Sequence, residues 1–156
     1  MNTKNCNENF LGMAAEILAV PEENVDFYLP VDCADEVLDA SYFVADYQHG
    51  FMLMAKKKTI RISESLSASL AGDAYEAKVS WDVDAPDIAT ARLAEAQFKR
   101  LKRGANHLFI SMVDGQRYVL RVHKGAYSFN YIEKDGHYEC QFKAHSVSGF
   151  QRIPIR

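Results

Sequence analysis

Residues 106–145 read NHLFISMVDGQRYVLRVHKGAYSFNYIEKDGHYECQFKAH, and this stretch decides the fold class. Apolar residues crowd or alternate along it, and glycine-containing pairs interrupt it at 114–115, 124–125 and 135–136. Such pairs are typical of tight turns between antiparallel strands. We therefore predict a β-meander in which consecutive strands pair. The expected strands lie near 106–113, 116–123, 126–133, 137–145 and 149–155.

Further strands are expected upstream of this meander. From Tyr75 to Val83 apolar and polar residues alternate strictly, which predicts a half-buried strand. The apolar run 51–55 indicates a buried strand, and the alternation over 58–63 indicates another. Residues 63–72 are rich in serine and alanine, and the sequence leaves a loop and a short helix equally open there.

Three helices are predicted from helical spacing and end signals. The first covers 11–18 and stops before Pro21, and the second covers 32–47, with Asp32 as its cap. The third begins after Asp87 and ends at Gly104. Its expected apolar face consists of Ile88, Ala91, Leu93, Ala94, Phe98 and Leu101. The fold class is therefore α+β, with about three helices packed on an antiparallel meander formed mainly by the C-terminal half.

Composition excludes several classes of protein. The chain has 156 residues, 48% hydrophobic and 25% charged, as is ordinary for a globular domain. We expect one domain over residues 1–156, with residues 1–8 frayed. No apolar run approaches the ~18 residues that cross a membrane, so we expect a cytoplasmic protein without a membrane partner. Three widely spaced cysteines fit neither a disulfide framework nor a paired metal motif, and we expect no cofactor or metal.

Charge is segregated along the chain. Residues 1–48 carry one basic residue against ten acidic ones, whereas residues 97–156 carry eleven basic residues against four acidic ones. The opposite charges could cancel inside one monomer, or one end could face a charged partner. Both interpretations are open at the level of sequence.

The first functional hypothesis is a non-enzymatic binding or regulatory protein. Basic and aromatic residues of the predicted sheet could contact phosphates and stack on bases. The partner would be nucleic acid or a protein that handles nucleic acid. The aromatic strand face could instead be buried, or form a homodimer interface. The proposed contact residues are Arg117, Arg121, Lys124, Tyr127, Tyr131 and Lys143.

Two alternatives remain open. An inhibitor or immunity-type protein would occupy a basic groove of its target with the acidic residues Glu22, Glu23, Asp35, Glu36 and Asp39. A small enzyme would need a site assembled from distant residues, such as His49 with Asp46, or His107 with His123. We give preference to the non-enzymatic interpretation, because the chain holds no recognisable catalytic motif.

Overall fold

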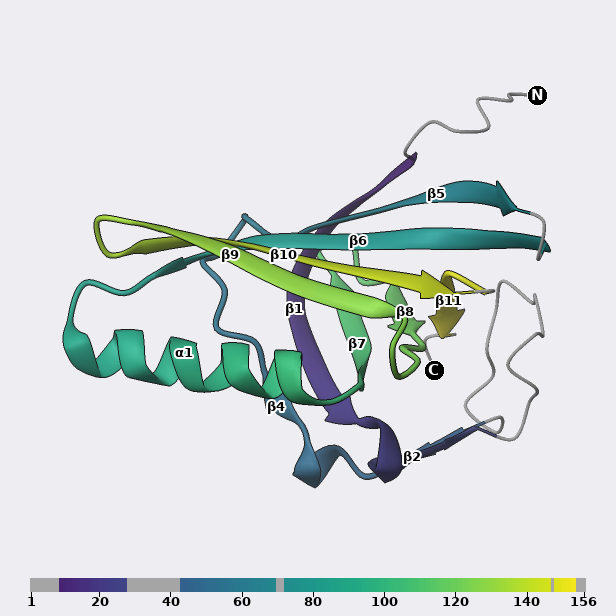
Figure 1. Cartoon of the computed structure of the whole chain (residues 1–156), viewed down its shortest axis with the longest axis horizontal. Coiled ribbons are helices and arrows are strands. Elements are labelled where there is room, and N and C mark those ends of the chain that lie inside the picture. The colour runs from purple at the N-terminus through teal and green to yellow at the C-terminus, as the bar shows by residue number, and fades with distance from the viewer. Residues whose placement is uncertain (1–8, 28–42, 70–71, 147, 154–156) are drawn as a thin grey trace.

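The described part of the chain folds into a large antiparallel sheet with one α-helix (Figure 1). The computed structural model describes residues 9–27, 43–69, 72–146 and 148–153. The strand order is β11-β8-β7-β1-β5-β6-β10-β9, and β4 also pairs with β1. The strands are β1 (Asn9–Pro21), β4 (Phe51–Met52), β5 (Arg61–Ser69), β6 (Gly72–Asp84), β7 (Asn106–Met112), β8 (Arg117–Leu120), β9 (Tyr127–Lys134), β10 (His137–Ser146) and β11 (Phe150–Ile153).

The long strand β1 belongs to two sheets. Its first part pairs with β5, where Phe10 faces Ser63, and its second part pairs with β7, where Ala14 faces Met112. The pairing register shifts after Phe10 and again after Ala14, and such irregularities bend a strand. We call β1 (first part), β5, β6, β10 and β9 sheet A. We call β1 (second part), β4, β7, β8 and β11 sheet B.

The two sheets face each other across the main core. In Figure 1 the strands of sheet A run across the direction of β1 and β7. Side chains from both inner faces form one hydrophobic cluster that is almost fully buried. The sheets therefore form a sandwich with crossed strands. The cluster includes Ile62, Val79, Trp81 and Phe142 of sheet A and Ile17, Leu108, Ile110 and Leu120 of sheet B.

A smaller cluster covers part of the outer face of sheet B. The short strands β2 (Val25–Phe27) and β3 (Phe43–Ala45) pair with each other and pack on this face. Sheet B is consequently covered on both sides there, which explains why β7 is buried almost throughout, its polar residues Asn106 and His107 included. The cluster consists of Val20, Val25, Phe43, Phe109, Val119 and Ile153.

Helix α1 (Ile88–Arg103) closes one side of the sandwich and lies alongside β9 (Figure 1). It begins after Asp87, whose carboxylate accepts a hydrogen bond from the N–H of Thr90 at 2.7 Å. The predicted helix is confirmed. Two residues of its predicted apolar face, Ile88 and Leu93, are nevertheless exposed, and the buried face is Ala94, Phe98 and Leu101.

The prediction of about three helices on a meander is wrong. The described residues contain one α-helix, and most of them lie in strands. Residues 11–18 belong to β1. Their apolar residues fit helical spacing, but pairing with β5 and β7 makes the segment a strand. Residues 63–69 are strand too, paired with β6. Of the second predicted helix, residues 32–42 lie outside the described residues, and Phe43–Ala45 are strand β3.

The positions of the strands were predicted more accurately than the pairing between them. Strands β6 to β11 lie close to the expected positions, whereas the run 51–55 is paired only at Phe51–Met52. However, β8 pairs with β7 and β11 rather than with β9, and β10 pairs with β6 and β9 rather than with β11. The connections after β8 and β10 carry the chain from one sheet to the other.

A membrane-spanning helix is not found within the residues that the structure describes.

The connection between β10 and β11 depends on Gly149. Its φ of 63° lies in the left-handed region, and a side-chain Cβ at this position would overlap Oε2 of Glu64. The same Oε2 accepts a hydrogen bond from the N–H of Phe150 at 3.3 Å. Gly149 thus leaves room for the contact that holds this connection against β5.

We expect Gly149→Ala to lower the free energy of unfolding by about 1–3 kcal/mol, from backbone strain plus displacement of the Glu64 carboxylate. Urea denaturation measures this. Gly125→Ala is the matched control, because Gly125 has a φ of 80° and a Cβ added there would have no atom within 4 Å, so only strain applies. Equal losses in both variants would show that Glu64 plays no part.

Candidate binding surface

The aromatic face of β9 points into the molecule. Phe129 is buried in the main core, and the ring of Tyr127 stacks on Phe142 with centroids 5.9 Å apart. Tyr131 packs against Phe98 of α1 at 4.5 Å. Phe129 thus belongs to the core, whereas Tyr127 is half-buried and Tyr131 is 36% exposed beside the helix, so this strand face is buried only in part.

The basic residues of the first hypothesis are dispersed. Arg121 is 4% exposed, and its guanidinium lies 4.0 Å above the ring of Phe27. Arg117 lies on the outer face of sheet B, and Lys143 on the outer face of sheet A. Lys124 is exposed in the turn before β9. The structure therefore does not gather the six predicted residues into one surface.

Acidic and basic parts of the sequence meet at the end of α1. Glu22 and Glu23 are exposed in the 3-10 turn Glu22–Asn24, and Glu23 lines a shallow hollow with Arg100 and Arg103. This proximity favours partial cancellation of charge within the monomer. Asp35, Glu36 and Asp39 lie outside the described residues, so the inhibitor hypothesis stays a prediction.

His107 is buried and neutral. Its Nδ1 accepts a hydrogen bond from the N–H of Val122 at 2.9 Å, and its ring meets Phe27 edge-on at 5.0 Å. Burial, together with the nearby charges of Arg121 and His123, lowers the pKa of His107 to about 4. Such a histidine supports structure and is a poor general base at neutral pH.

The other histidine and cysteine side chains that could take part in catalysis or metal binding also lie in structural environments. Nδ1 of His49 lies 2.6 Å from Oδ2 of Asp46, in an exposed turn that Asp46 also caps. Burial raises the pKa of the Cys140 thiol to about 12, with a contribution from Asp82. His137 contacts Asp84 at 3.1 Å. Across the described ranges, no three His, Cys, Asp or Glu side chains are arranged to hold a metal ion.

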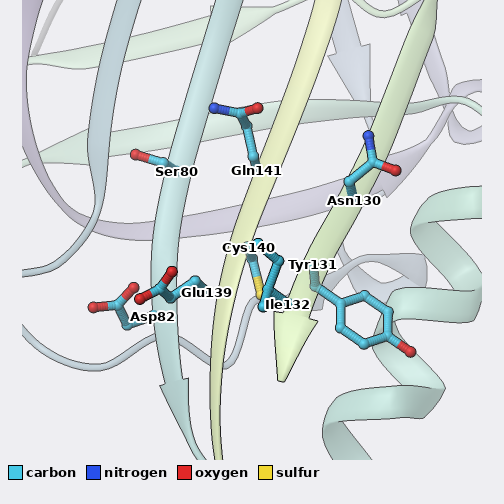
Figure 2. Close-up of a pocket in the computed structure, with 8 residues that line it drawn as sticks. All are labelled: Ser80, Asp82, Asn130, Tyr131, Ile132, Glu139, Cys140 and Gln141. Carbon is cyan, nitrogen blue, oxygen red and sulfur yellow. The ribbon is translucent and has the colours of Figure 1, made fainter. Parts of the chain in front are cut away.

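The outer face of sheet A is a polar, open surface. A hollow of about 360 Å³ lies between β6, β10 and β9. Among the residues that line it, the ring of Tyr131 is turned away toward α1 (Figure 2). Asp82 and Glu139 face each other across β6 and β10. His137 and Lys134 lie 3.9 Å and 3.8 Å from these two carboxylates. Each of these carboxylates thus has a polar side chain beside it, as on a solvated sheet face.

The outer face of sheet B is different. Beyond the part covered by β2 and β3 lies a hollow of about 230 Å³. Tyr47 and Met52 beside it are 45% and 44% exposed, and the ring of Tyr47 meets buried Phe109 edge-on at 5.3 Å. Burial raises the pKa of Tyr47, and the positive charge of Arg117 offsets only part of this increase. We call this set of residues the sheet-B face: Glu16, Leu18, Tyr47, Met52, Phe109, Ser111 and Arg117.

Comparison of the chain with protein-family models, curated proteins and solved structures finds no match. The interpretation of the sheet-B face therefore rests on its own geometry.

Sequence reasoning found only Arg117 of this face. Glu16 and Leu18 fell in a predicted helix, and Ser111 in the first strand of the predicted meander. The signal that remained was the unusual pair of polar positions, Glu16 and Ser111, in apolar segments. It becomes meaningful only once β1 is known to pair with β7.

Proposed function

We propose that this protein is a non-enzymatic binding protein that docks onto another protein chain through the sheet-B face. The observation that carries the proposal is the exposure of Tyr47 and Met52 around Phe109, next to Arg117. Tyrosine, methionine, phenylalanine and arginine are the residues enriched in the cores of protein interfaces.

The chemistry of the buried groups supports binding rather than catalysis. Burial displaces the pKa values of His107 and Cys140 away from the range in which they would act as a base or a nucleophile at neutral pH. The hollows on both sheets are shallow and open to solvent, which suits contact with a broad protein surface.

Photo-crosslinking tests the proposal. A photoreactive benzoylphenylalanine at position 52 is expected to give a discrete protein adduct in an extract of the source cells. The same group at position 141, on the outer face of sheet A, is expected to give none. Arg117→Glu should abolish the adduct at position 52, whereas Arg61→Glu, a charge reversal on sheet A, should preserve it. An adduct at position 52 that persists in the Arg117→Glu variant would contradict the proposal.

Nucleic-acid binding is a second candidate, now confined to one end of β9 and β10. Lys143, His145 and Tyr127 line a hollow there together with Gly125, which follows exposed Lys124. Fluorescence anisotropy with labelled single-stranded and duplex DNA and RNA, at two salt concentrations, tests it. Salt-sensitive binding weakened by Lys143→Ala and Lys124→Ala, and unchanged by Arg117→Ala, would favour this candidate. No binding at low salt would eliminate it.

A further inference from the structure

We infer that β9 is a docking edge for an extended segment of a partner protein, which adds to sheet A as a further antiparallel strand. The segment carries a basic, an apolar and an acidic residue in succession. The inference goes beyond the proposed function, because it concerns a different surface of the molecule and a different mode of binding.

The register of β9 shows which of its backbone groups point away from the sheet. β9 is the last strand of sheet A, paired with β10 on one side and with no described strand on the other. The N–H of His145 donates to the carbonyl of Ala126 at 2.9 Å. Because hydrogen-bonded and non-bonded pairs alternate in an antiparallel ladder, the even-numbered residues of β9 point their backbone groups toward β10. Tyr131 and Glu133 therefore point their N–H and C=O groups outward.

This outer edge is open over the second half of β9. Phe129 is only 4% exposed, whereas every residue from Asn130 to Lys134 is exposed. Helix α1 packs beneath the inner face of the strand, where the ring of Phe98 contacts that of Tyr131, and it leaves the edge itself accessible. Among the described residues, none forms a hydrogen bond with the outward backbone groups of Tyr131 and Glu133. Such an edge is a template for a further strand.

The inner side of the edge carries opposite charges at two neighbouring positions. The ammonium of Lys102 lies 5.2 Å from the centre of the Tyr131 ring and forms no ion pair within 4 Å with any described residue. Glu133 lies opposite Tyr138 of β10, whose hydroxyl donates to Glu95 at 3.4 Å. The edge is therefore basic beside Tyr131 and acidic beside Glu133.

The outer side of the edge is apolar between these two positions. Ile132 points to that side and is 58% exposed. Residues that lie opposite each other in an antiparallel pair share a face of the sheet, so each position of the added strand meets one of these environments. A basic residue opposite Glu133, an apolar residue opposite Ile132 and an acidic residue opposite Tyr131 are complementary to the edge. Antiparallel pairing gives that order from the N-terminus to the C-terminus of the segment.

A single extended segment suits the edge better than a second copy of β9. The segment needs room for one strand only. A second β9 would bring its own α1 beneath the same pair of joined strands, where α1 of the first copy already packs through Phe98.

Titration of the purified full chain with a labelled peptide tests the inference. The probe is fluorescein-labelled, C-terminally amidated Ser-Thr-Lys-Val-Glu-Thr-Ser, whose lysine, valine and glutamate lie opposite Glu133, Ile132 and Tyr131. Its fluorescence anisotropy is expected to show saturable binding below about 1 mM. Lys102→Glu is expected to weaken binding about tenfold, and a peptide with lysine in place of the glutamate should recover this loss. Arg61→Glu, the matched charge reversal on β5, should leave binding unchanged.

N-methylation of the peptide shows whether backbone hydrogen bonds hold it. In the added strand the N–H groups of the lysine and the glutamate point toward β9, and the N–H of the valine points away. A methyl group on the glutamate nitrogen is expected to abolish binding, whereas one on the valine nitrogen should preserve it. Equal effects of the two methyl groups would overturn the inference, as would a peptide that does not bind at about 1 mM.

Amide hydrogen exchange measured by NMR locates the bound peptide. Exchange at Tyr131 and Glu133 is expected to slow several-fold on binding. Exchange at Ile132, whose N–H points toward β10, should not change. Slow exchange at Tyr131 and Glu133 in the protein alone, growing with protein concentration, would show that a second copy occupies the edge and would overturn the assignment to a partner segment.

Failure of this inference is distinguishable from failure of the proposed function. Arg117→Glu changes sheet B and should leave peptide binding unchanged, so the adduct at position 52 and the peptide report on separate surfaces. Two strand spacings of about 4.8 Å separate the added strand from β10, so position 141 remains the control for the sheet-B face.

Discussion

Replacing Phe98 with alanine is expected to lower the free energy of unfolding by about 3–5 kcal/mol. Phe98 is 3% exposed and contacts three rings, with centroids 4.5 Å away in Tyr131 and 5.2 Å away in both Phe129 and Tyr138. Removing its ring leaves a cavity where α1 meets β9, and the rigid aromatic neighbours cannot collapse to fill it.

Chemical denaturation followed by circular dichroism measures this loss. Leu93→Ala is the matched control, because Leu93 lies on the same helix and is 63% exposed. Its effect is expected to stay within about 0.5 kcal/mol. Comparable losses for the two variants would mean that the helix is not held by its buried face.

Lowering the pH from about 6.5 to about 4 is expected to remove about 3 kcal/mol of stability through His107 alone. Burial lowers the pKa of this histidine from 6.5 to about 4 in the folded protein, so the unfolded chain binds a proton that the folded chain does not. The contribution of His107 is therefore complete above pH 6.5 and is lost as the pH falls to about 4.

Urea denaturation at several pH values, for the wild type and for His107→Asn, isolates this contribution. Asparagine can present an acceptor close to the position of Nδ1, and it does not titrate. The variant should show a shallower loss of stability between about pH 6.5 and 4.

Three other groups with shifted pKa values do not disturb this comparison. Burial and the charge of Arg121 lower the pKa of His123, but His123 is present in both proteins and its effect cancels. Asp84 and Asp87 have lowered pKa values, so their protonation reduces stability only at more acidic pH. Parallel pH profiles would refute the assignment.

Local signals in the sequence located most of the elements correctly. Glycine at residues 115, 125 and 136 has positive φ in the structure, so the turns occur where the sequence indicates them. Asp87 caps α1, and the alternation around Val79 and Trp81 matches β6. These features depend on a few neighbouring residues, which is why one sequence suffices to predict them.

The candidate site was beyond the reach of such signals. Arg121 was predicted on an exposed basic face because it alternates with apolar residues. In the structure β2 and β3 cover part of that face of sheet B, and Arg121 lies buried over the ring of Phe27. Glu16 and Arg117 are far apart in the sequence, and only the pairing of β1 with β7 and of β7 with β8 brings them into one row.

The sequence alone thus determined where strands, turns and α1 lie in the C-terminal half, because backbone preferences and side-chain alternation act over a few residues. Only the tertiary structure decided that residues 11–18 form a strand, that the chain changes sheets after β8 and β10, and which polar side chains share a face. Those outcomes depend on pairing and burial between segments far apart in the chain, and the apolar residues of a segment such as 14–20 fit the spacing of a helix and of a strand equally well.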